Sequence, residues 1–481
     1  MRGKVVRPAY SYCKVNPLTH LLLPLLLAQA AGSDQTAAPA PAPVAPKQAS
    51  SLACPTRMAP ISDDRDRLPW GVRTLSGEWN GLRDALEADG IVVLGRYTSI
   101  LMENFEGGLS TGFYGGGAAG VTVTLDTASC FDHDGGTVFL DWEYFDWYNG
   151  TFGQLGTYDP SGSVVGSNGN FINDDQSSFN AIAQLYYDQQ LIDNVLSLRF
   201  GKMDANATFS NVEPSGAFQY NLMHNPATLN PYFPTYPAEA TALQAQVNLG
   251  QYVTGYLGWY DGTTAAYDPA TGRSGPDTGT RGPATFFDND GHWFLITEWA
   301  VSWSIDDTYL GSLAVGGWLQ TGRTATSGTN TQGVEDVPGM YATLQQTVWA
   351  PDHDTAKSGG GIQLFGQFGL SDPDKNPVHW SMMGGVSATG VIPGRPDDAI
   401  GLAGGWTEFT DNAGVYQSQL RNGGPGASGG QETAIEVFYK AQVTPWLFVQ
   451  PGFEWIGSPG GGETQSLEDD VIGYLVVGME F

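Results

Sequence analysis

The sequence predicts an all-β fold, a sixteen-stranded antiparallel transmembrane β-barrel, and three observations support this prediction. Segments of about ten residues alternate apolar and polar side chains from Gly90 to the end of the chain, and turn residues separate them. Tryptophan and tyrosine gather near the segment ends, as in the girdles at the two faces of a membrane. The last residue, Phe481, ends an alternating segment, which is the usual ending of bacterial outer-membrane barrels. A soluble β-sandwich also alternates, but it does not call for such girdles.

The first thirty residues have the three parts of a secretory signal peptide. Four basic residues precede a short apolar run at 21–27, and the small residues Ala28-Gln29-Ala30 follow it. The run is shorter than the roughly 20 apolar residues that a membrane-spanning helix needs. We therefore expect residues 1–30 to be removed on export. Because the peptide contains no acid, its removal changes the formal net charge from −29 to −33.

Two segments precede the expected barrel at 91–481. Residues 31–68 contain the run APAPAPVAP, which cannot bury a core, and we expect a flexible periplasmic segment there. Residues 69–90 are expected to form a short N-terminal segment with a helix. Cys54 and Cys130 remain after signal cleavage, and in an oxidising compartment they can either pair or stay reduced.

The expected strands follow the alternation in chain order. In the fifth strand, for example, Leu198 and Phe200 share one face, while Ser197 and Arg199 share the other. The count is even, as single-chain bacterial barrels require. The sixteen expected strands are 90–101, 114–128, 137–147, 177–190, 195–202, 241–247, 252–260, 291–304, 310–320, 340–350, 360–370, 379–391, 400–409, 433–443, 446–456 and 471–481.

The connections between these strands alternate in length. Because the last strand must end in the periplasm, counting back assigns each connection to one side of the membrane. A barrel this wide keeps a water-filled lumen, which long outer loops can constrict. The inner connections are short, as at 191–194, 248–251 and 444–445, and the outer ones are longer, as at 149–176, 203–239 and 261–290.

Alternation also predicts which charged side chains face the lumen. Asp141 and Glu143 point opposite Leu140 and Trp142 on the third strand. The inward residues of the fifth strand are expected to be Arg199 and Lys202, and Arg96 on the first strand is a further candidate. Such side chains can exchange hydrogen bonds with a polar solute, or they can form an ion-pair network that only stabilises the wall.

The loop 203–239 is expected to constrict the pore. It has 37 residues, no lysine or arginine, and six aromatic residues, of which Tyr220 is a candidate solute contact. Loops longer than about 12–15 residues are usually functional. We expect this loop to fold against Arg199 and the acids of the third strand.

The expected helix at 81–89 holds the remaining candidate, Arg83. Leu82 and Leu86 lie on one side of this helix. Arg83 either braces the periplasmic mouth of the barrel or carries a solvated charge.

Several segments resemble the carbohydrate-selective porins of the OprB type. GEWNGLR at 77–83 is similar to the opening G-D-W-G-G-x-R motif of that family, with Glu78 and Asn80 as departures. The stretch 369–406 resembles the family's S-D-P-D-x-N-P-V and I-P-G-R-P-D-D segments closely. LSLRFGKMDANATFS at 196–210 and KAQVTPWLFVQPGFEWI at 440–456 are similar as well.

The resemblance implies a sixteen-stranded outer-membrane porin with outer loops folded into the lumen. It implies facilitated diffusion of glucose and similar monosaccharides into the periplasm. It also favours a functional role for Arg83, which ends the matching opening motif. It leaves open whether the protein is a monomer or a homotrimer. Sugar binding in such a pore has to be weak and distributed, because tight binding would stop transit.

Other function classes find little support in the sequence. The 50 acids against 21 bases argue against nucleic-acid binding, which needs a basic face. No nucleophile elbow, phosphate-binding loop or C-x-x-C motif occurs, and no metal or cofactor is expected. The alternatives are a secreted acidic β-rich glycosidase or another outer-membrane barrel enzyme. More than half of the net negative charge of the mature chain falls in the outer loops, where we expect divalent cations to bridge it to anionic lipopolysaccharide.

Overall fold

The structure, a computed structural model, describes most of the chain from Thr74 onward. The signal peptide, the segment 31–68 and Cys54 lie outside the described residues. Among the residues described, no helix is long and apolar enough to cross a membrane. The described ranges are 74–108, 111–147, 179–236, 238–265, 267–268, 273–274, 283–324, 333–412, 414–415, 429–461 and 467–481.

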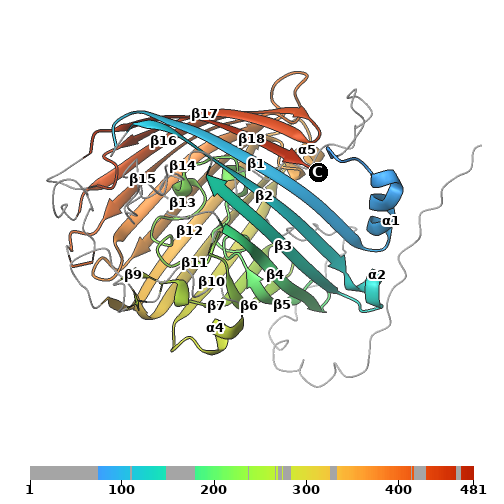
Figure 1. Cartoon of the computed structure of the whole chain (residues 1–481), viewed down its shortest axis with the longest axis horizontal. Coiled ribbons are helices and arrows are strands. Elements are labelled where there is room, and N and C mark those ends of the chain that lie inside the picture. The colour runs from blue at the N-terminus through green and yellow to red at the C-terminus, as the bar shows by residue number, and fades with distance from the viewer. Residues whose placement is uncertain are drawn as a thin grey trace, which may run out of the picture. The chain divides into compact units, whose positions relative to one another are not determined.

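Sixteen strands form a closed antiparallel barrel in this part of the chain, which confirms the fold class (Figure 1). Each strand pairs with its neighbours in the sheet, and β1 pairs with β18 to close the barrel. The strands are β1 (Ile91–Glu106), β2 (Gly112–Asp126), β3 (Gly136–Trp147), β4 (Phe179–Ile192), β5 (Leu196–Met203), β6 (Ala240–Leu249), β7 (Val253–Asp261), β10 (Trp293–Ile305), β11 (Tyr309–Thr324), β12 (Val334–Trp349), β13 (Gly361–Ser371), β14 (Val378–Thr389), β15 (Ala399–Phe409), β16 (Gln431–Thr444), β17 (Leu447–Gly457) and β18 (Asp470–Glu480).

Every expected strand overlaps an observed one, but several observed strands are longer. β1 continues to Glu106, and β11 and β12 each have 16 residues. The extra residues lie at the end of the barrel that bears the long loops, where polar residues still pair through their backbones. Such pairing cannot be predicted from side-chain alternation, because the alternation is lost where neither face of the strand touches lipid.

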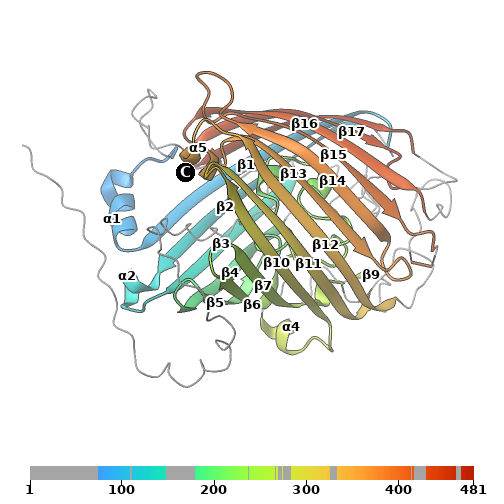
Figure 2. The same ribbon diagram turned by 180° about the vertical axis from the view of Figure 1, so that it is seen from behind.

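The short connections lie at one end of the barrel and the long loops at the other. Helix α1 (Leu82–Ala88), helix α2 (Thr127–Phe131), helix α5 (His353–Lys357) and the C-terminus lie at the same end in both views (Figures 1 and 2). We call this the short-turn end and the opposite one the long-loop end. Cys130 of α2 forms no disulfide within the described ranges, and its Sγ donates to the carbonyl of Asp89. Because Cys54 lies outside the described residues, both alternatives, a disulfide and two reduced cysteines, stay open.

The chain ends of the barrel are joined at the short-turn end. The amide of Phe481 donates to the carbonyl of Gly95 at 2.8 Å, and the amide of Leu75 donates to the carbonyl of Glu480 at 2.8 Å. The short helix η3 (Trp79–Gly81) and α1 follow Leu75 and lead into β1. The last residues of the sequence thus pair with the first strand.

The two faces of the barrel wall follow the predicted alternation. On β16, Ile435 is 45% exposed on the outer face, whereas its neighbour Glu436 is fully buried on the inner face. Apolar side chains such as Leu402 and Phe453 are likewise exposed on the outside. This outer surface is the neutral band that a membrane requires.

The loop 204–239 lies inside the barrel, where it forms most of the interior core. It contains the short helices η5 (Glu213–Ser215) and η6 (Asn221–Met223), and Figure 1 shows its green turns within the barrel. Phe218 packs on Phe365 of β13 and Phe438 of β16. A second cluster joins the loop to β4, β7 and β10–β12. The lumen is therefore narrowed by a packed loop, as the sequence predicted.

A second long connection joins β7 to β10. It contains η7 (Thr263–Ala265), a two-stranded ribbon of β8 (Tyr267–Asp268) and β9 (Arg273–Ser274), and helix α4 (Pro283–Phe287). Phe286 of α4 packs on Phe200 and Trp259. Both of these residues point outward, so α4 lies on the outer face of the barrel.

Candidate functional site: the constriction inside the barrel

Two buried carboxylates hold the loop 204–239 in the lumen. Glu298 of β10 accepts hydrogen bonds from the amide of Ser210 at 2.7 Å and from the hydroxyl of Tyr341 at 2.8 Å. An ionised acceptor forms stronger hydrogen bonds than a neutral one. Burying a backbone N–H without a hydrogen-bond partner is unfavourable, because the group loses its hydrogen bonds to water. By accepting from the amide of Ser210, Glu298 removes this penalty and makes burial of the loop possible.

Glu436 plays the same part on the opposite side of the barrel. Its two carboxylate oxygens accept from the amides of Gln219 at 2.7 Å and Tyr220 at 2.9 Å, and the hydroxyl of Tyr474 donates at 2.6 Å. The Tyr220 hydroxyl donates to Glu432, which lies four residues before Glu436 on β16. These contacts fix the middle of the loop to the wall formed by β16 and β18.

Neutral side chains of the wall bind the rest of the loop backbone. The amide of Ala227 donates to Ser381 Oγ at 2.9 Å. Gln450 Nε2 donates to the carbonyl of Ala217 at 2.7 Å, and Asn376 Nδ2 donates to the carbonyl of Thr228 at 2.9 Å. The loop thus leaves β5, crosses the lumen and is bonded to strands β14 and β17 before it returns to β6.

Arg96, Asp141 and Glu143 form a charged cluster on the inner wall. The guanidinium group of Arg96 pairs with Asp141 at 2.8 Å and also with Glu143. Both carboxylates are almost fully buried, whereas Arg96 keeps 16% of its side chain exposed. The cation therefore reaches the water of the lumen, with the two acids behind it.

Gly120 makes this cluster possible. In the register of the sheet, Arg96 on β1 is opposite Gly120 on β2, which is opposite Glu143 on β3. A Cβ atom at position 120 would lie 2.5 Å from Cζ of Arg96. Real Cβ atoms do not approach other atoms so closely, so any larger residue would displace the guanidinium group. The side chain of Arg96 crosses β2 because position 120 is empty.

Arg199 forms a separate group nearer the short-turn end. Its guanidinium group pairs with Asp188 of β4 at 2.8 Å and lies 4.5 Å above the ring centre of Tyr186. An ion-pair network of Arg199 with Asp141 and Glu143 was one of the two alternatives that the sequence left open, but those acids have Arg96 as their partner. The register of the strands explains the difference. Arg199 is opposite Asp188 on β4, and Asp188 is opposite Thr137 on β3, so Arg199 lies nearer the short-turn end than Asp141 and Glu143 do.

Lys202 lies close to the same wall. Its ammonium group donates to the carbonyl of Ile182 at 2.8 Å, and its charge interacts with those of Glu143 and Glu239. Glu239 ends the constriction loop and is buried. Burial raises the pKa of Glu239 well above its usual value, the charge of Glu143 raises it further, and Lys202 lowers it. Three acids, Glu143, Asp204 and Glu239, thus lie near one base, Lys202, where the loop starts and ends.

The loop follows only part of the predicted path. Asp204 at its start lies close enough to Glu143 for the two charges to interact. The hydrogen bonds that hold the loop, however, go to Glu298 and Glu436 rather than to Arg199 and the third strand. Glu436 was recognisable as an inward residue from alternation, but nothing in the sequence shows that it binds backbone amides 216 and 217 residues away.

Two of the candidate residues, Tyr220 and Arg83, are buried and do not offer a side chain to a solute in the lumen. Tyr220 is 1% exposed and anchors the loop, so it offers no surface to a solute. Arg83 is also buried, in contrast to the solvated charge considered above. It donates to Ser76 Oγ at 3.2 Å and lies 4.3 Å above the ring centre of Trp79, at the short-turn end. Leu82 is exposed instead, whereas Leu86 is half-buried, so the helix turns Arg83 inward and Leu82 outward.

No metal centre is found in the described part of the chain. No group of three or more histidine, cysteine, aspartate or glutamate residues there is arranged to hold a metal ion. The chemistry of this constriction is hydrogen bonding and charge, with Arg96, Arg199 and Asp188 as partly exposed groups.

Known proteins share both sequence and fold with this chain. The family described as carbohydrate-selective porin, OprB family, matches residues 135–481. Porin B of Pseudomonas aeruginosa is 29% identical over 151 residues, a stretch that covers 30% of this chain and 31% of Porin B. The match thus spans about a third of the length of that relative.

Two solved structures have the same fold. The high-pH structure of Pseudomonas putida OprB has a TM-score of 0.66 at 18% identity and covers 85% of this chain and 99% of its own. The low-pH structure of the same protein has a TM-score of 0.51 at 14% identity, with 85% and 98% covered. At these identities the likeness concerns the fold alone.

Proposed function

Because this chain belongs to the OprB family of carbohydrate-selective porins, we propose that it lets monosaccharides such as glucose diffuse across the outer membrane into the periplasm. Family membership places the barrel in the outer membrane, so the lumen is a route between its two sides. The family and the fold are those of channels rather than of enzymes.

The observation that carries the proposal is the constriction loop next to a partly exposed arginine. The loop is bonded to the wall on both sides of the barrel, through Glu298 and Glu436, so it narrows the route. A fixed loop favours small solutes, because a larger sugar would have to displace it. Monosaccharides are the smallest sugars, so a narrowed pore favours them over larger sugars.

The charges of the constriction suit a neutral polyhydroxy solute. A sugar hydroxyl both donates and accepts hydrogen bonds, and it can use the guanidinium group of Arg96 as a donor and the carboxylate of Asp188 as an acceptor. Arg199, which pairs with Asp188, adds a second partly exposed donor. These contacts are few and partly solvated, so they bind weakly enough for a sugar to leave.

Liposome swelling tests the proposal directly. Purified barrel is reconstituted, and swelling rates are compared for glucose, a disaccharide of glucose, and a charged solute of similar mass. We expect glucose to enter fastest. An Arg96→Gln variant is expected to lower the ratio of the glucose rate to the disaccharide rate by about tenfold, the effect of one charge-assisted hydrogen bond.

Arg323→Gln is the matched control, because Arg323 pairs with Glu335 in an exposed position at the long-loop end. It should leave the ratio unchanged. Equal entry of glucose and the disaccharide in the wild type would contradict the proposal. So would release of reducing sugar from an oligosaccharide, since a channel does not break bonds.

A further inference from the structure

One part of the inner wall carries no charge on the short-turn side of the constriction loop. Ser302, Ser312 and Gln345 are neighbours in one register row on β10, β11 and β12. Gln363 and Ser387 are opposite each other on β13 and β14, nearer the short-turn end than that row. We call these five residues the neutral patch. Between that row and the short-turn end, none of the described inward residues of β10 to β15 is charged.

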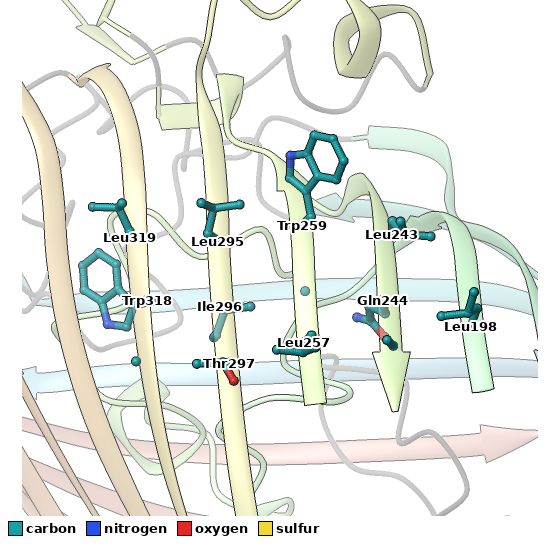
Figure 3. A pocket seen from close by; sticks show the side chains of 13 residues that line it. Leu198, Leu243, Gln244, Leu257, Trp259, Leu295, Ile296, Thr297, Trp318 and Leu319 are labelled. Carbon is teal, nitrogen blue, oxygen red and sulfur yellow. The ribbon is translucent and has the colours of Figure 1, made fainter. Parts of the chain in front are cut away.

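The side chains of the neutral patch point into the barrel. Side chains alternate between the two faces of a strand. The alternation can be followed on β10 in Figure 3, which draws the wall around an outer pocket: Leu295 is exposed, whereas the next residue, Ile296, is buried. Glu298 binds the constriction loop from the inner face, and Ser302 lies four residues further on the same face. The register then puts the rest of its row on the inner face as well.

The protein itself makes no use of the polar groups of the patch. In the part of the chain that the structure describes, none of the five side chains forms a hydrogen bond, and Gln345 Oε1 has no partner although it is shielded from the lumen. Ser302 is exposed, and most of the others are partly exposed. By contrast, Ser381, Gln450 and Asn376 each bind the backbone of the constriction loop. The patch therefore keeps its hydrogen-bonding groups for a molecule in the lumen.

The constriction loop adds one free carboxylate on this side of the barrel. The loop contains three acids, of which Asp204 and Glu239 are buried and Glu213 is exposed. The carboxylate of Glu213 has no partner among the described residues. Glu213 begins the short helix η5, which lies against β13 and β14, the strands that carry Gln363 and Ser387.

The path of the loop brings η5 to the end of these strands where the patch lies. Pro226 lies over Gly369, near the long-loop end of β13, and Phe218 packs on Phe365, four residues nearer the short-turn end. The loop thus approaches the short-turn end as its residue numbers fall. η5 precedes Phe218 in the chain and continues this course, so Glu213 lies towards the neutral patch.

This combination of groups suits an uncharged sugar. The two oxygens of a carboxylate can accept from two adjacent hydroxyls, and the amides and hydroxyls of the patch both donate and accept. Neighbouring strands are about 4.8 Å apart, close to the separation of hydroxyls on alternate ring carbons of a sugar. A cation would pair with Glu213 without using the patch, and an anion would be repelled.

We propose that Glu213 and the neutral patch form a second contact surface for a monosaccharide, on a different part of the wall from Arg96 and Arg199. Glu213 accepts hydrogen bonds from two adjacent sugar hydroxyls, and the patch bonds to the remaining ones. Glu213 is thereby a specificity-determining residue. The inference rests on the proposed function, because it requires that the sugar enters the lumen, and it adds where the sugar is bound on the short-turn side of the loop.

Glucose titrated against the single-channel ion current tests the proposal. A sugar that occupies the pore reduces the current, and the concentration that gives half of the effect measures its binding. Glu213→Gln removes the charge and keeps the shape of an exposed side chain, and its heat-sensitive band on a gel of unboiled samples shows that the barrel is closed. Glu335→Gln, an equally exposed change at the long-loop end, is the matched control.

We expect the half-saturating glucose concentration to rise about tenfold in Glu213→Gln, as the loss of a charge-assisted hydrogen bond would cause, and to stay unchanged in Glu335→Gln. Two monodeoxyglucoses, each lacking one hydroxyl of the bonded pair, should bind the wild type about tenfold more weakly than glucose does. The Glu213→Gln barrel should not distinguish these two sugars from glucose.

Equal glucose binding by Glu213→Gln and the control would overturn the proposal. It would also be overturned if Glu213→Gln changed only the reversal potential in a salt gradient, since Glu213 would then serve cations. Both results leave the wild type blocked by glucose and the proposed function intact. If glucose had no saturable effect on the wild type, the proposed function would fail together with this subsite.

A variant of the patch tests the other half of the surface. Gln345→Met keeps the length of the side chain and removes its amide. We expect glucose to bind this variant about fivefold more weakly, the effect of one neutral hydrogen bond. Unchanged glucose binding in Gln345→Met would show that the neutral patch has no part in sugar contact and would overturn the proposal.

Discussion

At the scale of single residues, the constriction depends on where the wall leaves space as much as on its charged groups. Alternation placed Asp141 and Glu143 on the inner face, and both are there. Their partner is Arg96 because Gly120 lets the guanidinium group cross β2. The sequence shows the glycine and the arginine, but their juxtaposition depends on the register between β1 and β2, which the alternation alone does not determine.

Replacing Gly120 by Ala should separate Arg96 from its carboxylates. The new methyl group would occupy the position of the guanidinium group, at a cost in stability of about 1–3 kcal/mol. We expect the ratio of glucose to disaccharide swelling rates to fall to that of Arg96→Gln. The double variant Gly120→Ala/Arg96→Gln should fall no further, since both changes remove the same interaction. Additive effects of the two substitutions would contradict this account of Gly120.

At the scale of elements, the central feature is a loop that is buried together with its backbone amides. Its aromatic residues predicted burial, because such a loop is poorly solvated. Its anchors were not predictable, since Glu298 and Glu436 meet the loop only after the barrel has closed. Polar residues that face the lumen are common on barrel strands. The sequence alone does not show which of them bind a loop and which line the open pore.

Removing the charge of Glu436 should loosen the loop. Glu436→Gln weakens the hydrogen bonds from two amides and a tyrosine hydroxyl, by about 1.5–3 kcal/mol for bonds to a charged group. We expect faster entry of disaccharides and a larger, noisier single-channel conductance. Glu335→Gln, at an exposed position, is the control and should conduct like the wild type. A conductance of Glu436→Gln equal to that of the control would show that the loop is held by packing alone.

Acidification should loosen the same loop through His224. Burial lowers the pKa of His224, although the hydrogen bond between its Nε2 and the Phe218 carbonyl at 2.8 Å acts in the opposite direction. A lowered folded-state pKa means that the released loop binds the proton more readily. The packed loop is therefore most stable above the ordinary histidine pKa of about 6.5, and stability is lost as the pH falls from there towards the folded-state value.

Conductance measured as a function of pH checks this expectation. The wild type should conduct more as the pH falls below about 6.5, and a His224→Gln variant should lose that part of the change. Glu239 has a raised pKa, so its protonation favours the packed loop at low pH and works against the histidine effect. The difference between the two proteins isolates His224. Identical pH profiles would exclude it as the cause.

At the scale of the whole molecule, the barrel is completed by contacts between the two ends of the described chain. β1 pairs with β18, and Phe481 pairs with Gly95 through its backbone. A closed sheet has no free edges, so each strand is stabilised by both neighbours. Closure is therefore the step on which the stability of the entire barrel depends.

Deleting Phe481 should reduce the yield of closed barrel. The deletion removes the last backbone pair between β1 and the C-terminus, together with the terminal aromatic residue. We expect a smaller share of the protein to run as the fast, heat-sensitive band on a gel of unboiled samples. Phe453→Ala removes an outward aromatic residue of β17 and is the control. If both variants gave the same share of fast band, the C-terminal residue would have no special role in closure.

The sequence by itself determined the sixteen strands, their inner and outer faces and the presence of a long aromatic loop in the lumen. These properties are local, because a strand in a membrane barrel must alternate and a long loop rich in aromatic residues is poorly solvated. The tertiary structure decided which groups meet. Arg96 binds the acids of β3, Arg199 binds Asp188, and Tyr220 anchors the loop, because sheet register and loop path bring together residues that are far apart in the chain.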